Sequence, residues 1–304
     1  MALGACAKAF SNESGPSARE HGRLRGLLDL DFQRAGASNR TALIRSLQEP
    51  PLRVVRAFER EDGSALAHLH NVSGGVLGGD SLMLRVRLGQ EASAQLTTTG
   101  ATRIYRPRVD APTAVQINEI FVGEDALLEY VPDPIIPFSG ARFSQRTTIH
   151  LAPRAGLFWW EILGPGREAR GEIFQYEMIE MITDIVADGC RIAAERTRLE
   201  PESGDPHSLA RLGNYRYLAS FYICRVGLDA KAWIAAEEQL RQVARTAAYS
   251  SDTLWGISAL AADGVVLRCL AQRGLDASSG LHTIWRAAKT LLFHRETIPP
   301  RKVN

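Results

Sequence analysis

The stretch SLMLRVRL, residues 81–88, has Leu or Val at every second position and Arg at two of the positions between them. Because successive side chains of a β-strand point to opposite faces, this segment predicts a strand with one buried and one solvated face. Similar runs lie on both sides of it, and Gly or Pro separates them roughly every ten to fifteen residues, as in an all-β sandwich, barrel or solenoid. The other predicted strands are 27–33, 52–58, 93–98, 113–121, 126–131, 143–151, 156–163 and 173–186.

The spacing of apolar residues changes after residue 230. It predicts amphipathic helices over 233–247 and 281–291, and a strand pair over 254–270 that turns at Asp263-Gly264. We therefore expect a mainly β protein with a few α-helices toward the C-terminus that cap or flank the sheet. Residues 1–26 are predicted to form a mobile tail and 27–304 a single domain. No fixed-length repeat supports an ordinary repeat solenoid.

The chain is nearly neutral, with 36 Lys plus Arg against 34 Asp plus Glu, which argues against nucleic acid as a main partner. Its four cysteines are isolated, match no zinc-finger or thioredoxin spacing, and favour a reducing compartment. No uncharged stretch reaches the length of a membrane helix, and Lys8 interrupts the apolar residues at the N-terminus. We therefore expect a cytoplasmic protein with no membrane partner.

A glycine-rich segment, Gly74–Asp80, lies between two predicted strands. It lacks the Lys-Ser/Thr pair of a phosphate-binding P-loop, and it leads into a strand where a dinucleotide fingerprint would lead into a helix. We interpret it as a pair of tight turns in which Asp80 accepts backbone N–H groups, with a ligand site as the alternative.

Carboxylates and histidines supply the other candidate ligands. Glu129 and Asp133 lie in a segment whose three prolines predict an extended, rigid connection. They could coordinate a cation or act as acid and base, but no His or nucleophile is near in sequence, so a structural role is favoured. His68 and His70 share one face of a predicted strand and could bind a transition metal, although no third ligand is evident.

Aromatic and charged residues surround a Gly-Pro-Gly turn at 164–166. The default interpretation of this region, residues 159–172, is a solvated hairpin tip. Because aromatic residues and arginine dominate binding hot spots, a surface for a protein partner is the alternative.

Together these segments resemble the UreD family of urease accessory proteins, also called UreH. The resemblance runs through the whole chain after the N-terminal tail, in ordered motifs. They are residues 51–56, 69–71 with 74–80, 96–105, 130–138 with 141–143, 166–174 and 298–301. Two short stretches, Thr99-Gly100 and Lys302-Val303, depart from the family pattern.

The resemblance implies a fold and a function that the residue pattern alone does not give. The implied fold is an irregular β-helix-like body of many strands with a few helices near the C-terminus. The implied function is that of a non-catalytic scaffold, which joins UreF and the GTPase UreG on apo-urease and helps to insert nickel(II) into the urease active site. Nickel would be in transit, and no cofactor would be permanently bound.

Nickel in transit needs several weak oxygen ligands, because a complete set of strong ligands would hold the ion too firmly. Within the matching motifs, the candidate path residues are Asp80, Thr98, Glu129, Asp133 and Glu172. Amphipathicity together with aromatic and arginine content selects the candidate partner-binding residues, which are Trp159, Trp160, Arg167, Arg170, Trp285, Leu292 and Phe293.

A second class of function is a cation-dependent hydrolase with a carboxylate site built from Asp80, Glu129 and Asp133. The sequence shows no nucleophile–base pair, phosphate loop or strong metal quartet, so the scaffold is favoured over an enzyme.

Overall fold

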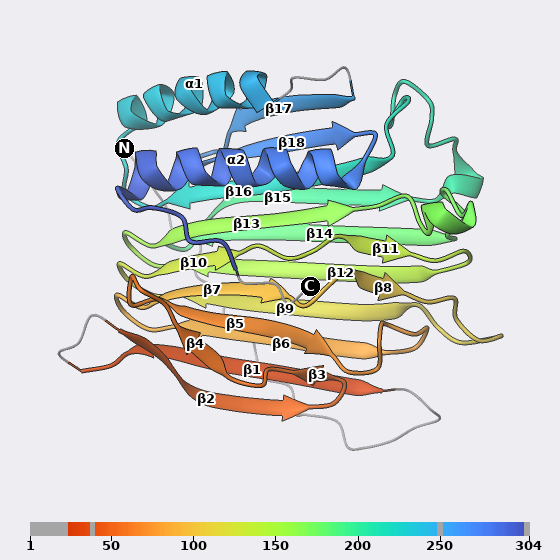
Figure 1. The fold of residues 1–304 in the computed structure, drawn as a ribbon, viewed down its shortest axis with the longest axis horizontal. Coiled ribbons are helices and arrows are strands. Elements are labelled where there is room, and N and C mark those ends of the chain that lie inside the picture. The colour runs from red at the N-terminus through yellow and green to blue at the C-terminus, as the bar shows by residue number, and fades with distance from the viewer. Residues whose placement is uncertain (1–23, 37–39, 248–251, 301–304) are drawn as a thin grey trace, which may run out of the picture.

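The computed structural model describes residues 24–36, 40–247 and 252–300, and it contains two stacked β-sheets with helices against one of them (Figure 1). Most of the predicted mobile tail, residues 1–26, lies outside the described residues. The strands of the seven-stranded sheet are β1 (Arg25–Arg34), β2 (Thr41–Glu49), β6 (Ser81–Leu88), β9 (Ala114–Val122), β12 (Arg142–Leu151), β14 (Met178–Ala187) and β15 (Cys190–Leu199).

The other sheet has eleven strands, which are two to nine residues long. Its strands are β3 (Leu52–Arg53), β4 (Ala57–Glu59), β5 (Ala65–Asn71), β7 (Ser93–Thr98), β8 (Thr102–Ile104), β10 (Leu127–Tyr130), β11 (Ile135–Pro137), β13 (Gly156–Leu163), β16 (Tyr217–Arg225), β17 (Thr253–Ala259) and β18 (Gly264–Ala271).

From β5 to β14 the chain winds as a flattened β-helix, because it passes back and forth between the two sheets (Figure 1). Strands β6, β9, β12 and β14 pair in parallel in one sheet, and β5, β7, β10 and β13 do so in the other. Antiparallel strands extend both sheets at their margins. The predicted β-helix-like body is confirmed.

Each turn of the β-helix, here called a coil, passes from one sheet to the other through a corner, and the corners at one end of the coils have the same backbone geometry. Glu91, Asp125 and Arg154 have positive φ at equivalent corners, and a buried alanine follows each of them. The backbone N–H of Gly123 donates to Leu88, and that of Ala152 donates to Val122, so one corner is bonded to the next. The corners are 34 and then 29 residues apart, which explains why the sequence shows no repeat of fixed length.

Two α-helices, α1 (Ala230–Ala247) and α2 (Gly274–Phe293), cover the outer face of the eleven-stranded sheet. Their apolar stripes pack with the outward side chains of that sheet into one core, so the predicted helices at 233–247 and 281–291 are confirmed. No helix among the described residues is long and apolar enough to cross a membrane.

Local differences from the predicted strands have physical causes. The strand predicted over 173–186 begins only at Met178, since Phe174 has φ 52°, which an extended strand does not allow. The strand predicted over 52–58 is divided into β3 and β4, with Val54, Val55 and Arg56 between them.

Candidate functional site

Between the two sheets, a band of polar side chains separates two apolar clusters. On β9 the inward residues Gln116 and Asn118 lie between Ala114 of one cluster and Ile120 of the other. On β12 the inward residues Gln145 and Thr147 also lie between the two apolar clusters. On β14 the inward residue Thr183 lies between them in the same way. Buried polar groups need hydrogen-bond partners, so a continuous polar band is an unusual interior for a sheet sandwich.

Hydrogen bonds link the members of this polar band. The Gln116 amide donates to Asn118 Oδ1 at 3.0 Å, and the Asn118 amide donates to Thr147 Oγ1 at 3.0 Å. The Gln145 amide donates to Glu161 of β13, on the opposite sheet. The two sheets are therefore connected by polar contacts inside the molecule.

Three cavities follow the polar band from β5 toward β15 and β16. The large cavity, about 260 Å³, shares Thr102, Gln116 and Tyr130 with a middle cavity of about 30 Å³. The middle cavity shares Glu161 with a third one of about 20 Å³. We call the three together the internal passage. Its narrow parts are the size of one or two water-sized species.

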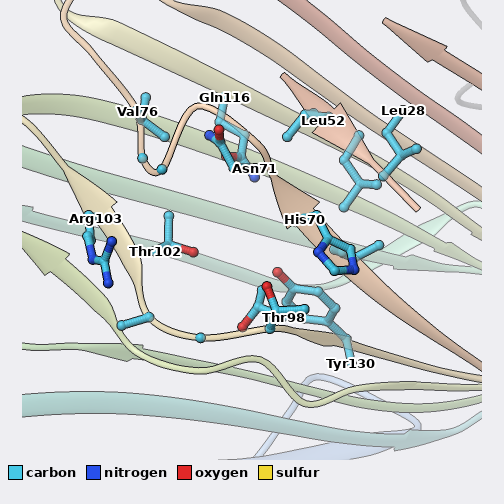
Figure 2. Close-up of a pocket in the computed structure, with 17 residues that line it drawn as sticks. Leu28, Leu52, His70, Asn71, Val76, Thr98, Thr102, Arg103, Gln116 and Tyr130 are labelled. Atoms are coloured by element: carbon cyan, nitrogen blue, oxygen red, sulfur yellow. The ribbon is translucent and has the colours of Figure 1, made fainter. Parts of the chain in front are cut away.

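Figure 2 shows the large cavity, whose wall comes from both sheets. Gln116 is on β9 of one sheet, and Thr98 and Tyr130 are on β7 and β10 of the other. The glycine-rich loop forms another part of the wall through Gly74 and Gly75.

Close packing fixes the glycine-rich loop against β8. The backbone N–H of Val76 donates to Arg103 O at 2.8 Å, and the Tyr105 hydroxyl donates to Gly74 O at 3.1 Å. A Cβ on Gly75 would lie 2.5 Å from the Tyr105 ring, so this position has room only for glycine. The predicted bond from the loop to Asp80 is present, because the Leu77 N–H donates to its carboxylate at 2.9 Å.

Glu161 is the most perturbed carboxyl group of the internal passage. Burial raises its pKa to about 7, although hydrogen bonds from neighbours including Gln145 and Thr183 act in the opposite direction. Such a group changes its charge near neutral pH. Sequence reasoning missed it because Glu161 follows two tryptophans in a run that resembles a hairpin. Only the stacking of the two sheets places Glu161 beside Gln145.

Of the predicted path residues, the structure brings Thr98 and Asp133 together at the passage. The Thr98 hydroxyl donates to Asp133 Oδ2 at 3.1 Å and accepts the Asp133 backbone N–H at 2.8 Å. Thr98 lines the large cavity and Asp133 the middle one.

The other predicted path residues lie elsewhere. Asp80 holds the glycine-rich loop, and burial raises its pKa. Glu172 forms an ion pair with Arg167, which lowers the pKa of the Glu172 carboxyl, and it also accepts the Ser139 N–H at 3.2 Å.

Glu129 faces away from the internal passage, toward α2. It is 1% exposed, and its two oxygens accept from Trp285 Nε1 and Lys289 Nζ, each at 2.7 Å. A carboxylate with both oxygens bonded in a sealed layer is not available to an ion in the passage. The structure therefore contradicts the placement of Glu129 on a path.

Four predicted partner-binding residues are buried inside the chain. Trp159, Trp160, Trp285 and Leu292 are at most 3% exposed, so their side chains do not form a surface. The apolar content that selected them reflects the cores on the two faces of the eleven-stranded sheet. Arg167, Arg170 and Phe293 are half-buried or exposed and stay candidates for partner contacts.

No group of three or more His, Cys, Asp or Glu side chains placed to hold a metal ion occurs in the part of the chain that the structure describes. His70 lines the large cavity, and burial together with the charge of His68 lowers its pKa. The passage thus offers scattered donors, mostly oxygens, and no closed ligand set among the described residues.

Comparisons with known proteins agree over the length of the chain. A family model described as UreD urease accessory protein matches residues 24–304. The urease accessory protein UreD of Herpetosiphon aurantiacus is 43% identical over 281 residues, covering 92% of this chain and 97% of that protein. The UreD of Pseudomonas aeruginosa PAO1 is 33% identical over 298 residues, covering 94% and 97%. The UreD of Halalkalibacterium halodurans is 33% identical over 202 residues, covering 66% and 73%.

Proposed function

The chain belongs to the UreD family of urease accessory proteins, with a role in urease maturation, and we propose that it acts there as a non-catalytic scaffold. In this proposal it joins UreF and the GTPase UreG on apo-urease, and nickel(II) moves through its interior toward the urease active site. The cytoplasm is the proposed compartment, which fits the free, buried thiols of Cys224 and Cys269.

The internal passage is the observation that carries the nickel part of this proposal. Nickel(II) stands high in the divalent affinity series, so a complete ligand set would trap it. Isolated hydroxyl, amide and carboxyl oxygens of Thr98, Gln116, Asp133 and Glu161 offer weak sites in succession. Conduction needs binding that is favourable enough for entry and weak enough for release.

No arrangement of the described residues favours the hydrolase alternative. Its three carboxylates have separate structural partners: Asp80 holds the glycine-rich loop, Glu129 binds Lys289, and Asp133 bonds Thr98. A hydrolytic site needs such groups to converge on one substrate position.

The proposal is tested by urease activation in cells that express the urease subunits and the other accessory proteins, with and without this chain. We expect apo-urease without nickel to accumulate when the chain is missing. Asp133→Asn removes a charge from the passage with little change of shape, and we expect it to lower the nickel content and activity of urease. Asp188→Asn, in an exposed turn, is the matched control. Full activation without the chain would refute the role, whereas full activation with Asp133→Asn would exclude that residue from the path.

A further inference from the structure

The outer face of the seven-stranded sheet is rich in charged side chains. On β6, β9, β12, β14 and β15, outward positions hold more arginines than acids. The arginines are Arg85, Arg87, Arg142, Arg146, Arg191, Arg196 and Arg198, and the acids are Glu119, Glu180 and Asp184. We call this set the basic face.

Two acids of the basic face, Glu180 and Asp184, lie beneath its arginines, whereas Glu119 at 35% is as exposed as its partner Arg85 at 30%. The side chain of Glu180 is 12% exposed, whereas those of Arg196 and Arg198, which pair with it, are 61% and 45% exposed. Asp184 is 22% exposed beneath Arg146 and Arg191, at 55% and 66%. Over Glu180 and Asp184, the outermost layer that a partner meets is therefore made of the guanidinium groups of the four arginines that pair with them.

The basic face also has an aromatic centre. The ring of Phe121, which is 38% exposed, stacks on His150 with ring centroids 5.0 Å apart. The Arg87 guanidinium lies 5.8 Å from the Phe121 centroid. Arginine and aromatic side chains are the residue types enriched in protein interfaces.

The outer faces of the two sheets differ in whether α-helices pack on them. Helices α1 and α2 pack on the eleven-stranded sheet, and the basic face is on the other sheet. Sheets with parallel strands are commonly covered on both faces. Neither α1 nor α2 covers the basic face, and the positive layer over Glu180 and Asp184 fits a partner with an acidic surface.

We propose that the basic face is a docking surface for an acidic surface of a protein partner. A protein fits better than a nucleic acid, because six carboxylates pair with these seven arginines and because the whole chain carries only +2. The inference rests on the scaffold role proposed above for the identity of the candidate partners, but the chemistry of the surface stands without it.

The first arm of the test measures binding of the full chain to poly-L-glutamate over increasing NaCl concentration. In Arg146→Glu/Arg196→Glu, we expect binding to weaken by about tenfold. The matched control is Lys231→Glu/Arg286→Glu, with the same change of charge at exposed positions of α1 and α2. We expect the control to bind like the wild type. If circular dichroism shows that the reversed variant does not fold, Arg146→Gln/Arg196→Gln replaces it, with Lys231→Gln/Arg286→Gln as control.

Equal binding by variant and control would overturn the inference, and so would tighter binding of the wild type to duplex DNA than to poly-L-glutamate.

The second arm captures UreF, UreG and apo-urease separately on the immobilised chain. We expect the variant to lose at least one protein that the wild type and the control both capture. A variant that captures all of them overturns the docking surface and leaves the scaffold role standing. A wild type that captures none refutes the scaffold role, and the first arm still decides the basic face.

Discussion

At the scale of single residues, the interior of this protein uses carboxyl groups in two different ways. Glu129 is fully partnered, since Lys289 and Trp285 donate to its two oxygens. Glu161 has amide and hydroxyl neighbours and no cation bonded to it among the described residues, and burial raises its pKa to about 7. The first arrangement holds a helix in place, whereas the second leaves a charge that can change near neutral pH.

Glu161 makes the stability of the protein depend on pH. Its carboxyl pKa is raised to about 7 in the folded chain, so the folded state binds the proton more tightly than the unfolded state. The stabilisation is complete at pH values below the unfolded pKa, near 4.5, and is lost as pH rises through 7. The loss for this group is about 3 kcal/mol. We expect Glu161→Gln to remove this part of the pH dependence between pH 5 and pH 8, as measured by urea unfolding at each pH. An unchanged slope in the variant would contradict the buried, protonated carboxyl.

The buried pair of Glu129 and Lys289 predicts an asymmetric mutational response. Lys289→Met leaves a buried carboxylate without its cation, and we expect a loss of about 3–5 kcal/mol in the free energy of unfolding. Glu129→Leu/Lys289→Met removes both charges, and we expect it to be much closer to the wild type. Arg241→Ala breaks exposed pairs on α1 and serves as control, with an expected change below about 1 kcal/mol. Denaturant unfolding measures all three, and equal losses in the single and double variants would refute the prediction.

At the scale of elements, the coils show why an internal repeat escaped the sequence pattern. Each corner needs a residue with positive φ followed by a small buried residue, and the chain meets this need with Glu91-Ala92, Asp125-Ala126 and Arg154-Ala155. Three different side chains satisfy one backbone requirement, and the coils between them differ in length. The repeat is therefore one of backbone geometry and burial, with little identity of residues.

Gly75 tests the packing of the glycine-rich loop on β8. In Gly75→Ala the added Cβ would lie 2.5 Å from the Tyr105 ring and 2.6 Å from Arg103 O, so the loop must move. We expect a loss of about 1–3 kcal/mol and a lower melting temperature. Gly100→Ala is the matched control, because Gly100 also lines the large cavity and its Cβ would meet nothing within 4 Å. Equal melting temperatures of the two variants would show that the loop is not held as described.

At the scale of the whole molecule, residue pattern predicted the elements better than their assembly. The alternation in 81–88 and the stripe at Trp233, Ala236 and Leu240 identified a strand and a helix, because period and burial are local properties. Which strands become neighbours depends on contacts far apart in sequence, such as β1 with β6. The resemblance to a known family supplied the β-helix that the pattern left open.

The candidate site was predicted in part for the same reason. Thr98 and Asp133 were selected by motif and do meet at the passage. Glu161 and Gln145 were missed, since only the stacking of the two sheets brings their side chains together. Trp159 and Trp285 were misassigned to a surface because aromatic content does not distinguish an interface from a core.

The passage predicts that a plug in its narrow part separates assembly from nickel delivery. Thr102 lines both the large and the middle cavity, so Thr102→Leu would add apolar volume to the wall that the two cavities share. A hydrophobic constriction excludes water and a hydrated ion. We therefore expect the variant to bind its partners normally while the nickel content of urease, measured by metal analysis, falls well below the wild-type value. Thr283→Leu makes the same substitution at an exposed position of α2, away from the basic face, and controls for added apolar volume. Normal nickel loading with Thr102→Leu would mean that the ion does not use this part of the interior.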